Sequence, residues 1–343
     1  MKAHVLITSN ETFPVCRDRL FWGIGVEDCP NEFEKWLSPA NSKKAYLKML
    51  VDMMGIDIGD LVFLYERQVG FHGVYKVKDA LFFDTTRVCD SGGRVVGEHW
   101  PLRITLECLY YFPRAVAEDL LFSTPHYESV FWIWTYRKNQ GPRGCNTITP
   151  EATEALVELL VKVNGAAGVY EGLEKYAPDA SKRVEFCLRR VDERLALEDF
   201  LRGYLLARIG NGNELDDIFG PREDIEWVGN NVPYHISRKN IDLLAFHTNL
   251  KYTAVPLRYK YSVVELKKDT VQARDVSQVL QYSRWVAGRL ANGEVEMVQP
   301  ILVAYDFSRA ALRKAKDQEF NKTGIILAKY RAVSENNLTF GRV

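Results

Sequence analysis

The stretch 261–268, which reads YSVVELKK, constrains the fold of this chain more than any other. Its β-branched and aromatic residues are typical of a strand. Side chains two apart in a strand point to the same face, so Glu265 and Lys267 project together. The alternate residues, Val264 and Leu266, then point into a core. Charged side chains are rare on a buried strand unless they are paired or functional, which makes Glu265 and Lys267 candidates for a site.

Three further segments supply polar residues in a fixed order along the chain. Glu198 stands at the head of an amphipathic helical pattern, and Asp242 lies in the strand-like run 240–246. Gln278 and Tyr282 are four apart in another helical pattern, so they share one helix face. The order is therefore an acid in a helix, an acid in a strand, Glu-x-Lys in a strand, and Gln-x-x-x-Tyr in a helix.

This ordered set resembles the PD-(D/E)XK nuclease superfamily and, within it, the RecB-like branch that carries the Gln-x-x-x-Tyr element, and the resemblance covers about residues 195–329. The resemblance implies an α/β restriction-endonuclease-like domain, with a mixed sheet flanked by helices, that hydrolyses phosphodiester bonds. It implies metal binding by Asp242, Glu265 and Glu198. It also implies catalytic roles for the full set, which is Glu198, Asp242, Glu265, Lys267, Gln278 and Tyr282. One departure from the family pattern is that no proline precedes Asp242.

The chemistry of these side chains agrees with that activity. Carboxylate oxygens are hard ligands that select Mg²⁺, and Mn²⁺ commonly substitutes for it. A bound divalent ion polarises a phosphoryl group and lowers the pKa of its water, and Lys267 would stabilise the developing charge. Helical geometry turns Asp199 about 100° away from Glu198, so Glu198 is the predicted acid of the site. The alternative is a surface ion pair between Glu265 and Lys267 beside a core aspartate.

The length of 343 residues predicts two domains rather than one. We expect a domain at 1–163, a linker at 164–185 and the nuclease-like domain at 186–343, because breaks with glycine and proline interrupt the chain between the two halves. The chain has no formal net charge, but residues 181–343 hold 26 Lys and Arg against 21 Asp and Glu. This mild positive excess suits a domain that binds phosphates.

Residues 1–163 read as a β-rich α+β domain. Strands are predicted at 3–8, 61–66, 71–78, 102–108 and 130–136. Thr149 is predicted to cap a helix. The Gly-Asp-x-Val-x-x-Tyr pattern at 59–65, the Gly-x-x-x-Val pattern at 70–74 and the Gly/Arg loop 141–144 resemble the PUA-like superfamily, particularly its EVE, YTH and ASCH-type members. The resemblance implies a β-barrel that binds nucleic acid, and several family members read a modified base flipped into an aromatic pocket.

Aromatic side chains in this half supply candidate walls for such a pocket. In the predicted strand 130–136, Trp132 and Trp134 share one face. Trp22 lies in a second aromatic segment. A base stacked on an aromatic face gains about 1–3 kcal/mol, so Trp22, Trp132 and Trp134 are the candidate pocket residues. The alternative is that these rings belong to the core of the barrel.

Together these patterns predict a cytoplasmic, Mg²⁺-dependent endodeoxyribonuclease. We see no signal-peptide pattern, no apolar stretch of membrane-spanning length, and six scattered cysteines as in a reduced protein. The expected partner is duplex DNA that carries a modified or unpaired base, as in modification-dependent restriction, and a homodimer would supply two active sites for a double-strand break. The alternatives are a nucleic-acid-binding protein without catalysis, and a nuclease for branched or single-stranded DNA or for RNA.

Overall fold

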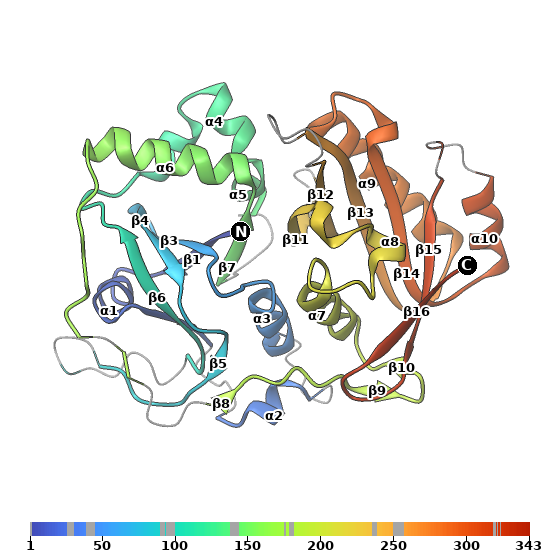
Figure 1. Cartoon of the computed structure of the whole chain (residues 1–343), viewed down its shortest axis with the longest axis horizontal. Coiled ribbons are helices and arrows are strands. Elements are labelled where there is room, and N and C mark those ends of the chain that lie inside the picture. Colours follow the sequence, from blue (N-terminus) through green and yellow to red (C-terminus); the bar gives the residue numbers. More distant parts are fainter. Residues whose placement is uncertain are drawn as a thin grey trace. The chain divides into compact units, whose positions relative to one another are not determined.

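The computed structural model describes residues 2–25, 31–38, 45–89, 93, 100–137, 144–174, 176–177, 182–234, 239–249, 257–317, 320, 322 and 324–343. Contacts divide the chain into two compact units, Met1–Glu185 (unit 1) and Phe186–Val343 (unit 2), which are described separately (Figure 1). Both units combine helices with sheets, which confirms the mixed α/β class. No helix within the described ranges is long and apolar enough to cross a membrane.

Unit 1 is built on a curled sheet, which is coloured blue to green in Figure 1. Its strands are β1 (Ala3–Thr8), β2 (Phe21–Ile24), β3 (Leu61–Glu66), β4 (Gly70–Val77), β5 (Phe82–Phe83), β6 (Leu102–Tyr110), β7 (Cys145–Ile148) and β8 (Lys182–Arg183). They follow the order β7-β1-β3-β4-β6-β5-β8, and β2 pairs with β6 beside this path. β1 and β3 are parallel, and their neighbours in the sheet are antiparallel. The strands predicted at 3–8, 61–66, 71–78 and 102–108 are confirmed.

Helices cover this sheet and close the core of unit 1. They are α1 (Phe13–Arg19), α2 (Phe33–Trp36), α3 (Ala45–Met53), α4 (Pro125–Val130), α5 (Trp132–Arg137) and α6 (Pro150–Asn164), with a 3₁₀ turn at Glu118–Phe122. α6 begins as predicted, because the Thr149 side chain accepts a hydrogen bond from the Ala152 N–H. Leu156 and Leu160 of α6 then pack against Phe63 and other buried residues of the sheet. Residues 141–143 of the predicted Gly/Arg loop lie outside the described residues.

The strand predicted at 130–136 is wrong, because α4 and α5 occupy this segment. Thr124 caps α4 and Pro125 occupies its first turn, and both are strong helix-start signals. All four residues 131–134 are buried, so the alternation of aromatic and aliphatic types carried no information about which face was inside. Trp132 and Trp134 therefore do not share one face of a strand.

The segment predicted to be a linker, 164–185, contacts both helix α1 and the sheet of unit 1. The Tyr170 hydroxyl donates a hydrogen bond to Asp18, and the Tyr176 hydroxyl donates one to Asp84. β8 pairs with β5 near the end of the segment. Two tyrosines thus anchor a stretch whose glycines and prolines predicted only a break in the chain.

Unit 2 is built on a second, mixed sheet with the strand order β11-β12-β13-β14-β15-β16. The strands are β11 (Ile225–Pro233), β12 (Asn240–Asn249), β13 (Leu257–Val271), β14 (Val298–Phe307), β15 (Ile326–Ala332) and β16 (Leu338–Arg342). β11, β12 and β13 form an antiparallel meander, and β13, β14 and β15 are parallel. The predicted strands around Asp242 and Glu265 are confirmed, whereas β11 is a strand that the sequence patterns above do not predict. Burial does not alternate along β11, so its sequence lacks the period of two that indicates a strand, and Asn231 adopts a positive φ within it.

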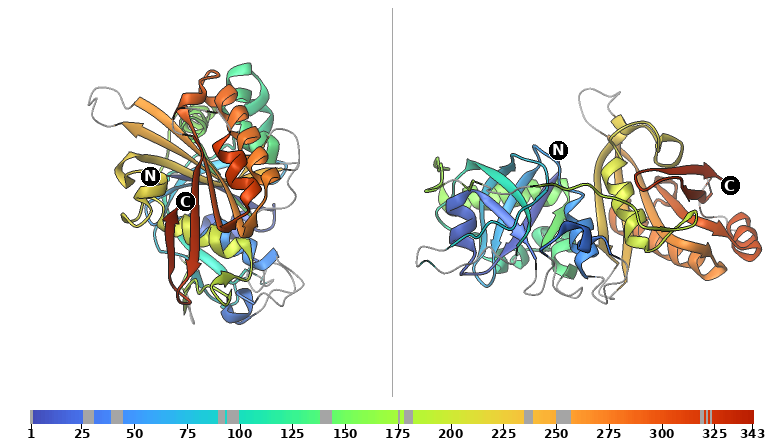
Figure 2. Two further views of the ribbon diagram at one scale, coloured as in Figure 1. Left: turned by 90° about the vertical axis from the view of Figure 1, so that its right-hand side faces the viewer. Right: turned by 90° about the horizontal axis from the view of Figure 1, so that it is seen from below.

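The helices of unit 2 that bear on the site are α7 (Glu198–Arg208), α9 (Ala273–Leu290) and α10 (Arg309–Lys316). The chain also has the short elements α8 (Asp216–Phe219), β9 (Arg190–Val191) and β10 (Arg194–Leu195). α9 follows β13 directly and packs on β13 and β14, and α10 lies beside α9 (Figure 2). α7 contacts β11 and β13. In chain order, unit 2 thus has a helix, three antiparallel strands, a helix, and a strand parallel to the third.

Candidate active site

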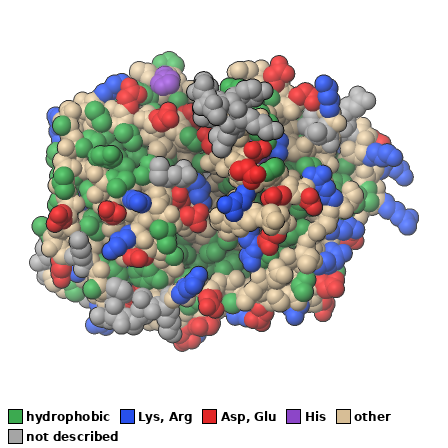
Figure 3. Space-filling model, viewed as in Figure 1, with side chains coloured by type: hydrophobic (Ala, Val, Ile, Leu, Met, Phe, Trp, Pro, Cys, Tyr) green, Lys and Arg blue, Asp and Glu red, His purple; other side chains and the backbone are tan. Residues whose placement is uncertain are grey.

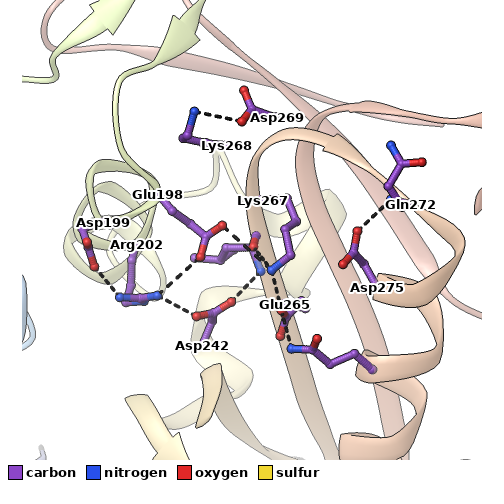
Figure 4. Close-up of polar contacts among 12 residues, drawn as sticks. Glu198, Asp199, Arg202, Asp242, Glu265, Lys267, Lys268, Asp269, Gln272 and Asp275 are labelled. Atoms are coloured by element: carbon purple, nitrogen blue, oxygen red, sulfur yellow. Dashed lines mark hydrogen bonds and ion pairs between the residues drawn. The ribbon is translucent and has the colours of Figure 1, made fainter. Parts of the chain in front are cut away.

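Four of the predicted polar residues of unit 2, Glu198, Asp242, Glu265 and Lys267, lie together in one partly buried cluster (Figure 4). β12 supplies Asp242, and its Oδ2 atom accepts a hydrogen bond from the Leu266 N–H at 2.8 Å. This bond ties the carboxylate to the neighbouring strand β13, which carries Glu265 and Lys267. The spacing of two along β13 does place these last two side chains together, because Lys267 Nζ lies 2.6 Å from Glu265 Oε1.

Helix α9 contributes the Gln-x-x-x-Tyr element to the same cluster. Gln278 Nε2 donates a hydrogen bond to Glu265 Oε1 at 2.8 Å and lies 3.0 Å from the Tyr282 hydroxyl. The predicted helix face is therefore confirmed for Gln278 and Tyr282. Gln278 holds Glu265 from the side of the helix, while Lys267 does so from within the strand, and Tyr282 contacts Gln278.

Helix α7 contributes Glu198 and also a residue that sequence reasoning missed, Arg202. Arg202 Nη2 lies 2.6 Å from Asp242 Oδ1 and 3.9 Å from Glu198 Oε1. Its Nη1 lies 2.6 Å from Asp199 Oδ1. Asp199, expected to point away from the site, is instead buried through this bond. The signal available in the sequence was the spacing of four between Glu198 and Arg202, which allows an ion pair along a helix.

The charges in the cluster do not balance. Glu198, Asp199, Asp242 and Glu265 supply four carboxylates, and Arg202 and Lys267 supply two cations. With every group ionised, a formal charge of about −2 remains in a partly buried site, which is unfavourable without another cation or bound protons.

Two of the acids in this cluster, Glu265 and Glu198, have raised pKa values. Burial and the charge of Asp242 raise the pKa of Glu265 to about 8, against the opposing effect of the Lys267 ammonium. Burial and Asp242 likewise raise the pKa of Glu198 to about 7. Glu265 Oε2 is buried and has no hydrogen-bond partner among the described residues. One oxygen of Glu265 is thus held twice, and the other is uncommitted.

The described residues contain no group of three or more His, Cys, Asp or Glu side chains already arranged to hold a metal ion. The contacts explain this arrangement. The Lys267 ammonium lies between Glu265 and Glu198, at 2.6 and 3.9 Å, and the Arg202 guanidinium bridges Asp199 and Asp242. The carboxylates are therefore connected through cations instead of converging on one point.

In unit 1, Trp134 belongs to the core. Its ring packs against Tyr65 and Phe71, and its Nε1 donates a hydrogen bond to Glu118 at 2.6 Å. Trp132, on the same helix, is also buried. Trp134 is therefore a core residue, which was the alternative interpretation of its sequence pattern.

Trp22 lines a cavity of about 300 Å³ in unit 1. Its Nε1 donates a hydrogen bond to the Ile7 carbonyl at 3.2 Å. The other lining residues are Ile7, Thr8, Ser9, Thr12, Cys16, Gly23, Ile24, Gly25, Met49, Arg67, Trp100 and Gly144. Trp132 and Trp134 do not line this cavity. The wall is a mixture of aromatic rings, hydroxyls and one guanidinium.

No family model and no curated protein sequence matches this chain. Solved structures are similar over about half of it. They include Rpa0253 from Rhodopseudomonas palustris, at 10% identity and a TM-score of 0.30, with 46% of this chain and 92% of that chain covered. Atu2648 from Agrobacterium tumefaciens shows 14% identity and a TM-score of 0.29, with 50% and 99% covered. Human THYN1, solved in complex with DNA that contains 5-methylcytosine, shows 9% identity and a TM-score of 0.28, with 47% and 98% covered. At these scores, the PUA-like and nuclease resemblances both remain predictions for this chain.

Proposed function

We propose that unit 2 is a metal-dependent nuclease that hydrolyses phosphodiester bonds in DNA. The observation that carries the proposal is the unequal hydrogen bonding of the two carboxylate oxygens of Glu265. Lys267 and Gln278 hold its Oε1 atom, and its Oε2 atom is buried without a partner in the described part of the chain. Asp242 and Glu198 lie in the same cluster, in which carboxylates outnumber cations. One divalent cation would therefore restore its charge balance. The order of helices and strands in unit 2 also agrees with the nuclease resemblance.

The donor set fits Mg²⁺ or Mn²⁺ in chemical type, because carboxylate oxygens are the ligands that hard cations prefer. Glu265, Asp242 and Glu198 would hold the ion, which when bound would polarise the scissile phosphate and acidify a water. Lys267 would keep its ammonium beside Glu265 and neutralise charge that develops on the phosphate. Gln278 would hold Glu265 in place and keep the Tyr282 hydroxyl oriented.

Exposed cations on α10 support a phosphate-containing partner. Arg309, Arg313 and Lys316 are exposed at a spacing of four and three, and Lys and Arg side chains gather at the right-hand edge of Figure 3, over this helix. None of the three has an ion-pair partner among the described residues. Such a row provides affinity for phosphates that does not depend on base sequence.

A cleavage assay tests the nuclease proposal. The full chain is incubated with plain, methylated, hydroxymethylated and single-stranded DNA, and with RNA, in Mg²⁺, in Mn²⁺ and in EDTA. We expect cleavage of at least one DNA substrate that EDTA abolishes and added Mn²⁺ restores. Absence of metal-dependent cleavage on every DNA substrate would contradict the proposal, and cleavage of RNA alone would transfer the activity to RNA.

For unit 1, we propose that the cavity beside Trp22 takes a modified or unpaired base and so selects the target. Its volume of about 300 Å³ lies at the lower end of the range for small-ligand pockets. Trp22 and Trp100 offer ring surfaces, and Thr8, Ser9 and Arg67 offer hydrogen-bonding groups. A cleavage-deficient Glu265→Gln protein, titrated with plain and modified oligonucleotides, would show the preference directly. Equal affinity for all of them would refute it.

One observation favours a second candidate, a nucleic-acid-binding protein without catalysis. Arg202 already engages Asp242 at 2.6 Å, and Lys267 already engages Glu265 at 2.6 Å. If these ion pairs are permanent, the cluster stabilises the fold and takes no metal. DNA binding that persists in EDTA, with no metal-dependent cleavage, would support this candidate over the nuclease.

A further inference from the structure

Arg202 occupies an unusual position for a helix residue. Its side chain is 8% exposed, and its guanidinium lies among the carboxylates of Glu198, Asp199 and Asp242. Two of these are at 2.6 Å and the third is at 3.9 Å. A buried arginine so placed supplies positive charge directly beside Asp242.

The two ends of the guanidinium have separate partners. Nη1 holds Asp199, which neighbours Glu198 on α7, and Nη2 holds Asp242 on β12. Arg202 can therefore release Asp242 and remain paired with Asp199. The third nitrogen, Nε, is buried and has no hydrogen-bond partner among the described residues. The guanidinium is thus incompletely satisfied in this position.

Resting on the proposed nuclease function, we propose that Arg202 is a resident cation that competes with the catalytic metal for Asp242. In the metal-free state it holds Asp242 Oδ1 through Nη2. When a divalent ion binds, Arg202 gives up this oxygen and keeps Asp199. Arg202 is a positioning residue in this scheme, and it sets the metal concentration at which the site fills.

The competing role predicts the direction in which metal affinity changes when Arg202 is lost, whereas a purely structural role predicts no change. A purely structural ion pair stabilises the metal-free and metal-bound protein equally, so its loss leaves metal affinity unchanged. A competitor stabilises only the metal-free state, so its loss tightens metal binding. A cation that supports the bound metal through Asp242 would have the opposite effect, and its loss would weaken metal binding.

The experiment measures Mn²⁺ binding by calorimetry and the midpoint of thermal unfolding, Tm, with EDTA or with Mn²⁺. The variants are Arg202→Met, which keeps an unbranched side chain without the charge, and Arg202→Lys, which keeps the charge but lacks the two-pronged guanidinium. Arg103→Met is the matched control, because Arg103 is fully buried beside Asp84 in unit 1, whereas the cluster belongs to unit 2. All three are compared with the wild-type full chain.

We expect Arg202→Met to lower Tm in EDTA, to show a larger rise in Tm on addition of Mn²⁺, and to bind Mn²⁺ roughly threefold to tenfold more tightly than wild type. Arg202→Lys should have an Mn²⁺ affinity between those of wild type and Arg202→Met. This variant keeps the test decisive if Arg202→Met does not fold. Arg103→Met should lose stability without any change in Mn²⁺ affinity. If wild type binds Mn²⁺ and the Arg202 variants bind it equally or more weakly, the inference about Arg202 is wrong, but the proposed function stands. Failure of wild type to bind Mn²⁺ would instead overturn the proposed function and the inference with it.

Discussion

Lys267 and Glu265 share one face of β13, and the ammonium of the first lies 2.6 Å from the carboxylate of the second. Gln278 donates to the same carboxylate oxygen at 2.8 Å. Because both donors hold Oε1, the buried Oε2 atom has no partner within the described residues. The pair therefore combines a fixed carboxylate with one uncommitted oxygen, which is the arrangement expected of a ligand that awaits a cation.

Replacement of Lys267 by Met should reduce cleavage by on the order of 10²- to 10³-fold, because the group that neutralises charge on the phosphate is lost. DNA binding should change little, since one partly buried lysine that is paired with Glu265 contributes little to affinity for the duplex. The measurement is the single-turnover cleavage rate in Mg²⁺ beside a binding titration. Lys268→Met is the control, because Lys268 is the next residue but pairs with the exposed Asp269. Equal rates for the two variants would remove Lys267 from the site.

Replacement of Asp242 by Asn or of Glu265 by Gln should abolish the rise in Tm that Mn²⁺ produces, together with cleavage. A hard divalent cation loses most of its affinity when one of its carboxylate ligands becomes a neutral amide. Thermal unfolding with and without Mn²⁺ reads this out independently of activity. Asp306→Asn serves as a control on the same sheet, because Asp306 is half-exposed and pairs with Lys329. A metal-induced shift of wild-type size in either site variant would contradict the ligand assignment.

The raised pKa values of Glu265 and Glu198 predict a pH-dependent loss of stability without metal. In the unfolded chain both acids titrate near the ordinary value of 4.5, whereas in the folded chain they titrate at about 8 and about 7. The folded state binds these protons more tightly, so its stability falls as pH rises from about 4.5 towards 8. Glu265→Gln mimics the protonated form at every pH. Its Tm in EDTA should therefore rise relative to wild type between pH 5 and pH 8, and a constant difference would show that Glu265 is not titrating there.

Local periodicity was sufficient to predict much of this cluster. The period of two in a strand placed Glu265 beside Lys267, and the spacing of four in a helix placed Gln278 beside Tyr282. These relations depend only on backbone geometry within one element, and they hold in the structure. The meeting of Asp242 with β13 needed the additional expectation that the two strands pair.

Relations between elements were not predictable in the same way. The helical period gives the angle between Glu198 and Asp199, but it does not say that Arg202 folds back to hold Asp199 inside the cluster. The alternating residue types in 130–136 wrongly predicted a strand. Residues 131–134 are all buried, so the alternation does not distinguish a buried face from an exposed one. A half-exposed strand encodes its buried face in such a pattern, but a fully buried segment does not.

Trp134 should act on the stability of unit 1 and not on its choice of DNA. The ring packs between Tyr65 and Phe71, and its N–H is bonded to Glu118. Trp134→Ala should cost about 3–5 kcal/mol of unfolding free energy, because it removes a large core side chain and leaves a cavity. Trp134→Phe should cost less and should keep any preference for a modified base. Denaturant unfolding measures the first effect, and a loss of base preference in Trp134→Phe would restore this residue to the pocket.

Trp100 offers the sharpest test of the cavity as a base pocket. Trp100 is half-buried, so its removal disturbs the core less than removal of the buried Trp22. In a Glu265→Gln background, Trp100→Ala should weaken binding of a modified or unpaired base by about 1–3 kcal/mol, the value of one stacking contact, and leave affinity for plain duplex unchanged. The plain duplex draws on phosphate contacts that do not involve this ring. Equal loss for plain and modified DNA would mean that Trp100 supports the fold or a general DNA surface, and that target choice lies elsewhere in the chain.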